Sequence, residues 1–244
     1  MRVFLCLLFF CLDCSIQLRA ASIAVDTLYD FESFTPGVTT FTTSDAPFSQ
    51  IEAALTTTAQ TVNSSTALQI DAVSAGQVAM NFSTAGRPSG GTFSFQYATL
   101  GGQNQSMRIV SSSDAGELYR LILNTDGSLT YQFGDGIGGT TTTATGAGIF
   151  QLDGSFNNIS VVIDTASDTW GFTVGSTTIS GLNFKADVDA SLVYGNTFRA
   201  QGSGGISVAL DDIQFSTIPE PSSISFFALG AGGIILLYRR KCAF

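Results

Sequence analysis

The densest acidic point of the chain is Asp211-Asp212, and two further acids, Asp30 and Glu32, lie near the start of the same Ser- and Thr-rich region. Carboxylate oxygens are the ligands that Ca²⁺ prefers. These four side chains are candidates for a structural calcium site if the fold brings the two segments onto neighbouring strands. The alternative is that the adjacent aspartates stabilise a bulge or turn through backbone hydrogen bonds.

Carboxylates could also hydrolyse a glycosidic bond, which needs two of them about 5–9 Å apart across a cleft. The region 25–218 holds three glutamates, Glu32, Glu52 and Glu117. Glu117 precedes an apolar run and could face a groove, but no acid near it in the sequence pairs with it. We interpret it as a solvated carboxylate at a strand edge, and we predict no catalytic residue.

Residue types that are missing exclude several other chemistries. The chain has no histidine, which removes the usual general base and any Ser-His-Asp triad. All four cysteines lie outside 25–218, so this region has no disulfide, thiolate metal site or cysteine nucleophile. Its 17 acidic and 5 basic residues give a net charge of −12, and the cations are spread widely along the sequence. We therefore expect neither a nucleic acid partner nor a cofactor, apart from the calcium ion.

The region that carries these side chains has the composition of β-structure, rich in Thr, Ser, Gly, Val, Ile and Phe. Apolar and polar residues alternate, as Phe93, Phe95 and Tyr97 do with Ser94 and Gln96. We predict an all-β, two-sheet antiparallel jelly-roll sandwich. The Thr-rich stretches 56–61 and 138–148 are predicted as flexible surface loops, with O-glycosylation as the alternative.

Two hairpins and one bulge are predicted within this sandwich. The run 118–123 meets 129–133 across a turn with Asp126-Gly127, which supplies the positive φ that tight turns need. The second hairpin joins 159–163 to 170–174, where Trp170 alternates in phase with the apolar side chains, so we assign it to the core rather than to sugar stacking. The alternation breaks at Asp211-Asp212, which predicts a bulge.

The strand pattern resembles that of concanavalin A-like and laminin-G-like domains over residues 25–217. The opening Tyr29-Asp30-Phe31-Glu32, the two hairpins and the closing segment 210–215 carry this resemblance. It implies that the first and last strands are neighbours, and that calcium lies between them, held by Asp30, Glu32, Asp211 and Asp212. Concanavalin-like glycosidases carry Glu-x-Asp-x-x-Glu on one strand, and no such run occurs in this sequence.

The two termini carry targeting signals. Arg2, the apolar run 3–12 and the small residues of Ser22-Ile23-Ala24 predict a signal peptide over 1–24. At the other end, Pro219-Glu220-Pro221 cannot join a helix or a sheet ladder. An uncharged run over 222–238 follows, long enough to cross most of a bilayer as a helix, and the cations Arg239, Arg240 and Lys241 end it.

The tail 218–244 closely resembles the PEP-CTERM sorting signal of Gram-negative bacteria. That resemblance implies an exosortase partner, transient anchoring in the inner membrane, and delivery to the outer surface or the extracellular matrix. An ordinary C-terminal anchor is the alternative. The sequence thus predicts an exported, non-catalytic surface or matrix protein that binds polysaccharide; the alternative is a carbohydrate-active enzyme, a glycosidase or lyase.

Overall fold

The computed structural model describes residues 21–101, 106–201 and 205–217. Outside these residues lie the predicted sorting motif 219–221, the apolar run 222–238, the predicted basic stop 239–241 and most of the predicted signal peptide. In the part described there are fifteen strands and two 3₁₀ turns, η1 (Thr84–Gly86) and η2 (Lys185–Asp187). That part contains no helix long and apolar enough to cross a membrane. The all-β prediction is confirmed for these residues.

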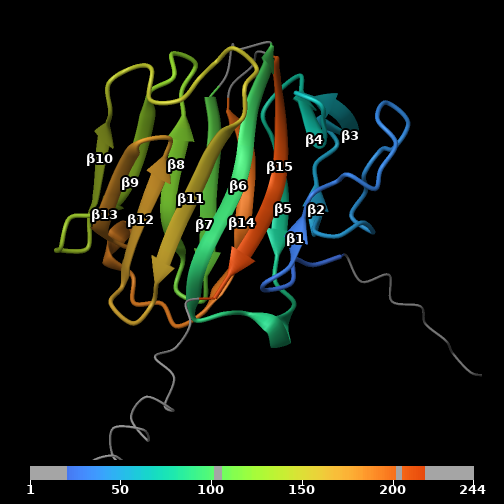
Figure 1. The fold of residues 1–244 in the computed structure, drawn as a ribbon. Coiled ribbons are helices and arrows are strands. Elements are labelled where there is room, and N and C mark those ends of the chain that lie inside the picture. The colour runs from blue at the N-terminus through green and yellow to red at the C-terminus, as the bar shows by residue number, and fades with distance from the viewer. Residues whose placement is uncertain (1–20, 102–105, 202–204, 218–244) are drawn as a thin grey trace, which may run out of the picture.

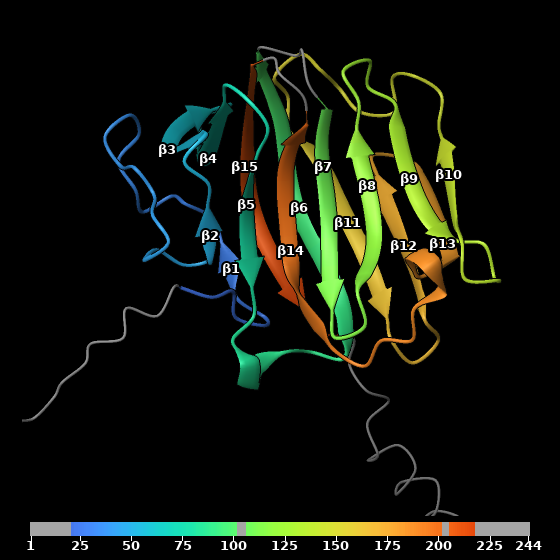
Figure 2. The same cartoon turned by 180° about the vertical axis from the view of Figure 1, so that it is seen from behind.

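The strands form two antiparallel sheets that lie face to face (Figure 1). We call the first the β6 sheet; its order is β13 (Thr177–Asn183), β12 (Thr169–Val174), β11 (Asn157–Asp164), β6 (Gly90–Gly101), β15 (Ile206–Ser216), β4 (Ser65–Ala72) and β3 (Leu55–Val62), with β1 (Leu28–Tyr29) also paired to β15. We call the second the β7 sheet, seen in front in Figure 2; its order is β10 (Thr140–Ala144), β9 (Leu129–Gly134), β8 (Glu117–Leu123), β7 (Ser106–Ser113), β14 (Val193–Gln201), β5 (Gly76–Asn81) and β2 (Gln50–Ile51).

The core fills the space between the two sheets because alternate residues of each strand point inward. Phe95 of β6 meets Phe198 of β14 with ring centroids 5.0 Å apart. Trp170 of β12 stacks on Tyr119 of β8 at 5.0 Å and 20°. All four side chains are buried, so aromatic pairs join the sheets at several points. The assignment of Trp170 to the core is confirmed.

Both predicted hairpins are present. β8 and β9 pair across a turn in which Gly127 has φ 76°, and the N–H of Asn124 donates to the carbonyl of Ser128 at 2.9 Å. β11 and β12 pair from Ile159–Val174 to Asp164–Thr169. The first and last strands are neighbours, since Leu28 pairs with Gln214. That adjacency was implied by the concanavalin-like resemblance.

The prediction of two Thr-rich loops is wrong. Residues 56–61 lie within β3, and most of the Thr run in 138–148 forms β10. Each strand stands at the end of its sheet, β3 in the β6 sheet and β10 in the β7 sheet. The side chains of β10 alternate between exposed and half-buried, so Thr, which favours strands, suits them better than a larger apolar residue. The outer side of β3 is partly covered, because Thr40 bridges to Thr58 and the N–H of Phe41 donates to the carbonyl of Thr57 at 3.0 Å.

Candidate functional site

The adjacent aspartates lie in a β-bulge of β15. The register of β15 against β6 shifts between Asp211 and Gln214. Leu210 and Ile213 are both fully buried in the core, so two residues stand between them where strict alternation allows one. Both aspartates therefore lie on the outer face of the β6 sheet. The predicted bulge is confirmed.

Asp211 turns toward the start of β4. Its Oδ2 lies 2.6 Å from the Oγ of Ser65, and Glu32 Oε1 lies 2.6 Å from the same oxygen. Glu32 Oε1 also accepts the backbone N–H of Thr66 at 3.1 Å. Burial raises the pKa of Asp211, and the nearby charges of Asp212 and Glu32 raise it further, against hydrogen bonds from Ser65 and the backbone that lower it.

The other two proposed calcium ligands are engaged elsewhere. Asp30 Oδ1 accepts the backbone N–H of Glu32 at 3.3 Å, and Asp212 Oδ2 accepts the side-chain amide of Gln96 at 2.7 Å. Within 21–101, 106–201 and 205–217, no group of three or more His, Cys, Asp or Glu side chains is placed to hold a metal ion. The structure thus joins Glu32 and Asp211 through Ser65, and calcium binding there stays a prediction.

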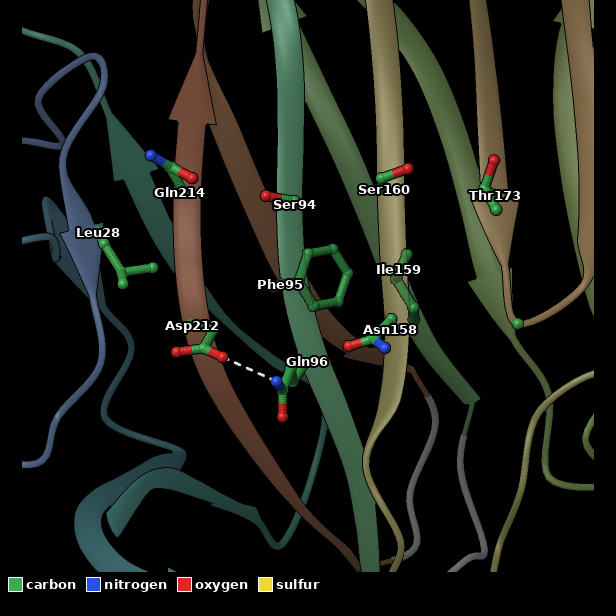
Figure 3. Close-up of a pocket in the computed structure, with 11 residues that line it drawn as sticks. Leu28, Ser94, Phe95, Gln96, Asn158, Ile159, Ser160, Thr173, Asp212 and Gln214 are labelled. Carbon is green, nitrogen blue, oxygen red and sulfur yellow. Dashed lines mark hydrogen bonds between the residues drawn. The ribbon is translucent and has the colours of Figure 1, made fainter. Parts of the chain in front are cut away.

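Asp212 opens onto a hollow of about 370 Å³ on the outer face of the β6 sheet (Figure 3). Strand register sets its polar side chains in a row, because Gln214 pairs with Ser94, Ser94 with Ser160, and Ser160 with Thr173. Leu28 of β1 lies at one end of this row and is half exposed. The row therefore crosses β15, β6, β11 and β12 at nearly one level.

A second row lies one step along the same strands and consists of Asp212, Gln96 and Asn158 (Figure 3). Gln96 pairs with Asn158 in the register and donates to Asp212. The two rows give the hollow hydroxyl and amide groups, each of which donates and accepts hydrogen bonds, beside a single carboxylate.

A second hollow, of about 230 Å³, continues the first across β12 and β13. Thr173 lines both, and the register pairs it with Thr178 on β13. The carboxylate that lines this hollow is Asp164, which accepts the N–H of Ala166 at 2.9 Å and the hydroxyl of Ser167 at 2.7 Å. We call the two hollows together the outer groove; each is lined by one carboxylate.

Glu117 lies on the other sheet. Its carboxylate pairs with Arg120 at 2.8 Å and with Lys185 at 3.0 Å, and its side chain is one-quarter exposed. It lines neither hollow of the outer groove. The sequence analysis interpreted Glu117 as a solvated carboxylate, which agrees with its partial exposure. It did not predict the two ion pairs with Arg120 and Lys185.

Apart from Asp212, which the sequence analysis named as a calcium ligand, the groove residues were not singled out from the sequence, although one signal for them was present. Alternation put Ser94 and Gln96 on the face opposite Phe95, which is where the structure has them. The pairing of β6 with β11, which brings Ser160 beside Ser94, depends on contacts between distant parts of the chain.

Comparisons with known proteins show likeness in fold. No protein-family model and no curated protein sequence matches the chain. A solved structure titled "Sialidase" matches 81% of this chain with a TM-score of 0.60 at 11% identity. The chain spans 19% of that sialidase's length. A structure titled "Apo Crh5 transglycosylase" matches with a TM-score of 0.50 at 11% identity, covering 83% of this chain and 88% of that one. The chain therefore shares a β-sandwich fold with these proteins.

Proposed function

We propose that this chain is an exported β-sandwich protein that binds a polysaccharide along the outer groove. The observation that carries the proposal is the row of Gln214, Ser94, Ser160, Thr173 and Thr178 across five adjacent strands. At about 4.8 Å between strands, the row is about 19 Å long, which suits a run of several sugar units better than a single one. Hydroxyl and amide groups match the hydrogen-bonding groups of sugars in both directions.

The groove favours binding over hydrolysis by two carboxylates. Each hollow is lined by one carboxylate, and Asp164 is committed to the turn that follows β11. The sialidase and transglycosylase matches are named for enzymes that act on sugars, so a carbohydrate ligand is in keeping with the fold. A glycosidase or lyase on this fold is the runner-up function, and the release of sugar products from the same polymers would favour it.

The groove is tested by binding of the full chain, in non-ionic detergent, to insoluble cellulose, β-1,3-glucan, xylan and galactan. Ser160→Leu fills the middle of the row and removes its hydroxyl, and should lower binding to the retained polymer about tenfold, as expected for the loss of one to two hydrogen bonds. The matched control is Thr197→Leu, at a half-buried position on the outer face of the β7 sheet. Equal binding by both variants and the parent chain would rule out the groove.

Export and sorting form the second part of the proposal. Its support is the order of motif, apolar run and basic stop at 219–241. We expect Pro219→Ala with Pro221→Ala to prevent processing and to keep the chain in the inner-membrane fraction. The control is the parent chain in the same cells. Unchanged processing and location would show that the motif is not the sorting determinant, and would leave an ordinary anchor.

A further inference from the structure

Most cations of the described residues gather on one face of the fold. Of the five basic residues in 25–218, three lie on the outer face of the β7 sheet: Arg108 on β7, Arg120 on β8 and Arg199 on β14. Lys185 reaches the same face by pairing with Glu117. The cluster could not be predicted from the sequence, because the three arginines are far apart along the chain and their strands become neighbours only in the folded sheet.

The register places the three arginines close together. Arg199 pairs directly with Arg108, and Arg108 pairs with Ile122, which is two residues from Arg120 on the same face of β8. Directly opposed residues have Cβ atoms about 5 Å apart, and diagonal neighbours are about 7–8 Å apart. Like charges at these separations destabilise a sheet. Burial lowers the pKa of Arg108, and the charges of Arg120 and Arg199 lower it further.

The ion pairs of Glu117 do not neutralise the cluster. Glu117 already forms ion pairs with two cations, Arg120 and Lys185. In the described part of the chain, neither Arg108 nor Arg199 has an ion-pair partner, and the buried Nε of Arg108 has no hydrogen-bond acceptor. Glu52, whose N–H donates to the carbonyl of Gln77 at 3.1 Å, adds a second acid at the β2 edge of this sheet. Around the arginines the face thus carries four cations and the ion-paired Glu117, within a region of net charge −12.

Two amides extend the cluster into a stripe. Gln77 of β5 pairs with Arg199, and Gln132 of β9 pairs with Arg120. We call these five residues the arginine stripe. It crosses β5, β14, β7, β8 and β9, which lie side by side in Figure 2. A site five strands long suits an extended polymer rather than a single small ion.

We propose that the arginine stripe binds an acidic polysaccharide through the carboxylate or sulfate groups of the polymer. Guanidinium groups match such anions with paired hydrogen bonds, and the flanking amides suit the sugar hydroxyls. Duplex nucleic acid is a poorer match, because it carries one charge about every 1.7 Å and the rest of this acidic protein repels it. The inference rests on the proposed export for access to such a polymer, but it uses the sheet opposite the outer groove. The protein then has two carbohydrate-binding faces and can link two chains.

The probe is polygalacturonate, with its methyl ester as the uncharged counterpart. Affinity electrophoresis of the full chain in non-ionic detergent is run at low and at physiological salt. Retardation by polygalacturonate, weaker at higher salt and absent with the ester, is expected. Arg108→Gln with Arg199→Gln should lower the affinity about tenfold or more, as the loss of charge-assisted hydrogen bonds predicts.

The controls separate this site from general charge and from the groove. Arg87→Gln removes a cation that stacks on Tyr194 at 3.7 Å and lies outside the stripe, so it should retain at least half of the affinity. Ser160→Leu should leave polygalacturonate binding unchanged. The proposal is overturned if Arg87→Gln weakens binding as much as Arg199→Gln, if the ester binds equally well, or if the double variant binds like the parent chain. Binding of anionic lipid vesicles or of a second copy in place of polygalacturonate also overturns it.

Discussion

Glu32 and Asp211 both contact one atom, the Oγ of Ser65, and each carboxylate oxygen lies 2.6 Å from it. A hydroxyl has one proton, so it can donate to only one of the two carboxylates. The second short contact needs a proton on a carboxyl group or a cation beside the oxygens. Asp211 is buried and burial raises its pKa, which favours the protonated form of this carboxyl group.

Asp211→Asn should stabilise the protein at pH 7 when calcium is absent. The amide can donate to Ser65, which donates to Glu32, and no charge is buried. A carboxyl group whose folded pKa is raised stabilises the fold below its unfolded pKa, and that contribution is lost as the pH rises through the folded pKa. The gain should therefore be about 1 kcal/mol at pH 7, or about 2–4 °C in Tm, and should vanish near pH 4.

Thermal melting in chelator at both pH values measures this effect. Asp114→Asn is the control with the opposite sign. Hydrogen bonds from the Ser191 hydroxyl and then the Leu192 N–H lower the pKa of Asp114, so its substitution should destabilise at pH 7 and have no effect in acid. A loss of stability at pH 7 for Asp211→Asn in chelator would contradict the arrangement in which a protonated Asp211 donates to Ser65 and Ser65 donates to Glu32.

Calcium is predicted to take the place of the carboxyl proton that allows Glu32 and Asp211 to contact the same Ser65 hydroxyl. Millimolar Ca²⁺ should raise the Tm of the parent chain at pH 7 and leave that of Asp211→Asn unchanged, since an amide is a weaker ligand than a carboxylate. Mg²⁺ at the same concentration is the control, because it needs a stricter octahedral geometry. Identical melting of the parent chain in Ca²⁺ and in chelator would remove the calcium site.

The sequence predicts which residues of each strand face the core. It does not predict features that depend on which strands pair in a sheet. Alternation was enough to predict that Phe95 and Trp170 are buried and that Ser94 lies on the opposite, half-buried face. The Thr content of β3 and β10 was interpreted as loop because an edge strand lacks the apolar residues that mark a central one. Both the outer groove and the arginine stripe depend on which strands pair, and no local pattern encodes that.

Ile23 is expected to remain in the mature protein. Its side chain is buried, and its N–H donates to the carbonyl of Asn81 at 3.1 Å beside a bridge to Phe82. Cleavage after Ala24, the sequence prediction, would remove it from the core. N-terminal sequencing of the protein isolated from the producing cells should find a start before Ile23, and Ile23→Ala should cost about 2–5 kcal/mol in urea unfolding. Ala24→Ser, at an exposed position, is the neutral control; a mature chain starting at Val25 would contradict the expectation.

Trp170 is predicted to report on how the two sheets pack. It is the single tryptophan, is buried, and stacks on Tyr119 across the core, so its emission should be blue-shifted and should move to the red on unfolding. Trp170→Ala should cost about 3–5 kcal/mol, measured by far-UV circular dichroism in urea. Trp170→Phe should cost far less, because it keeps a ring and removes the buried Nε1–H, which lacks a partner among the described residues. Water-exposed emission from the native protein, or equal losses for the two variants, would mean that Trp170 does not join the sheets.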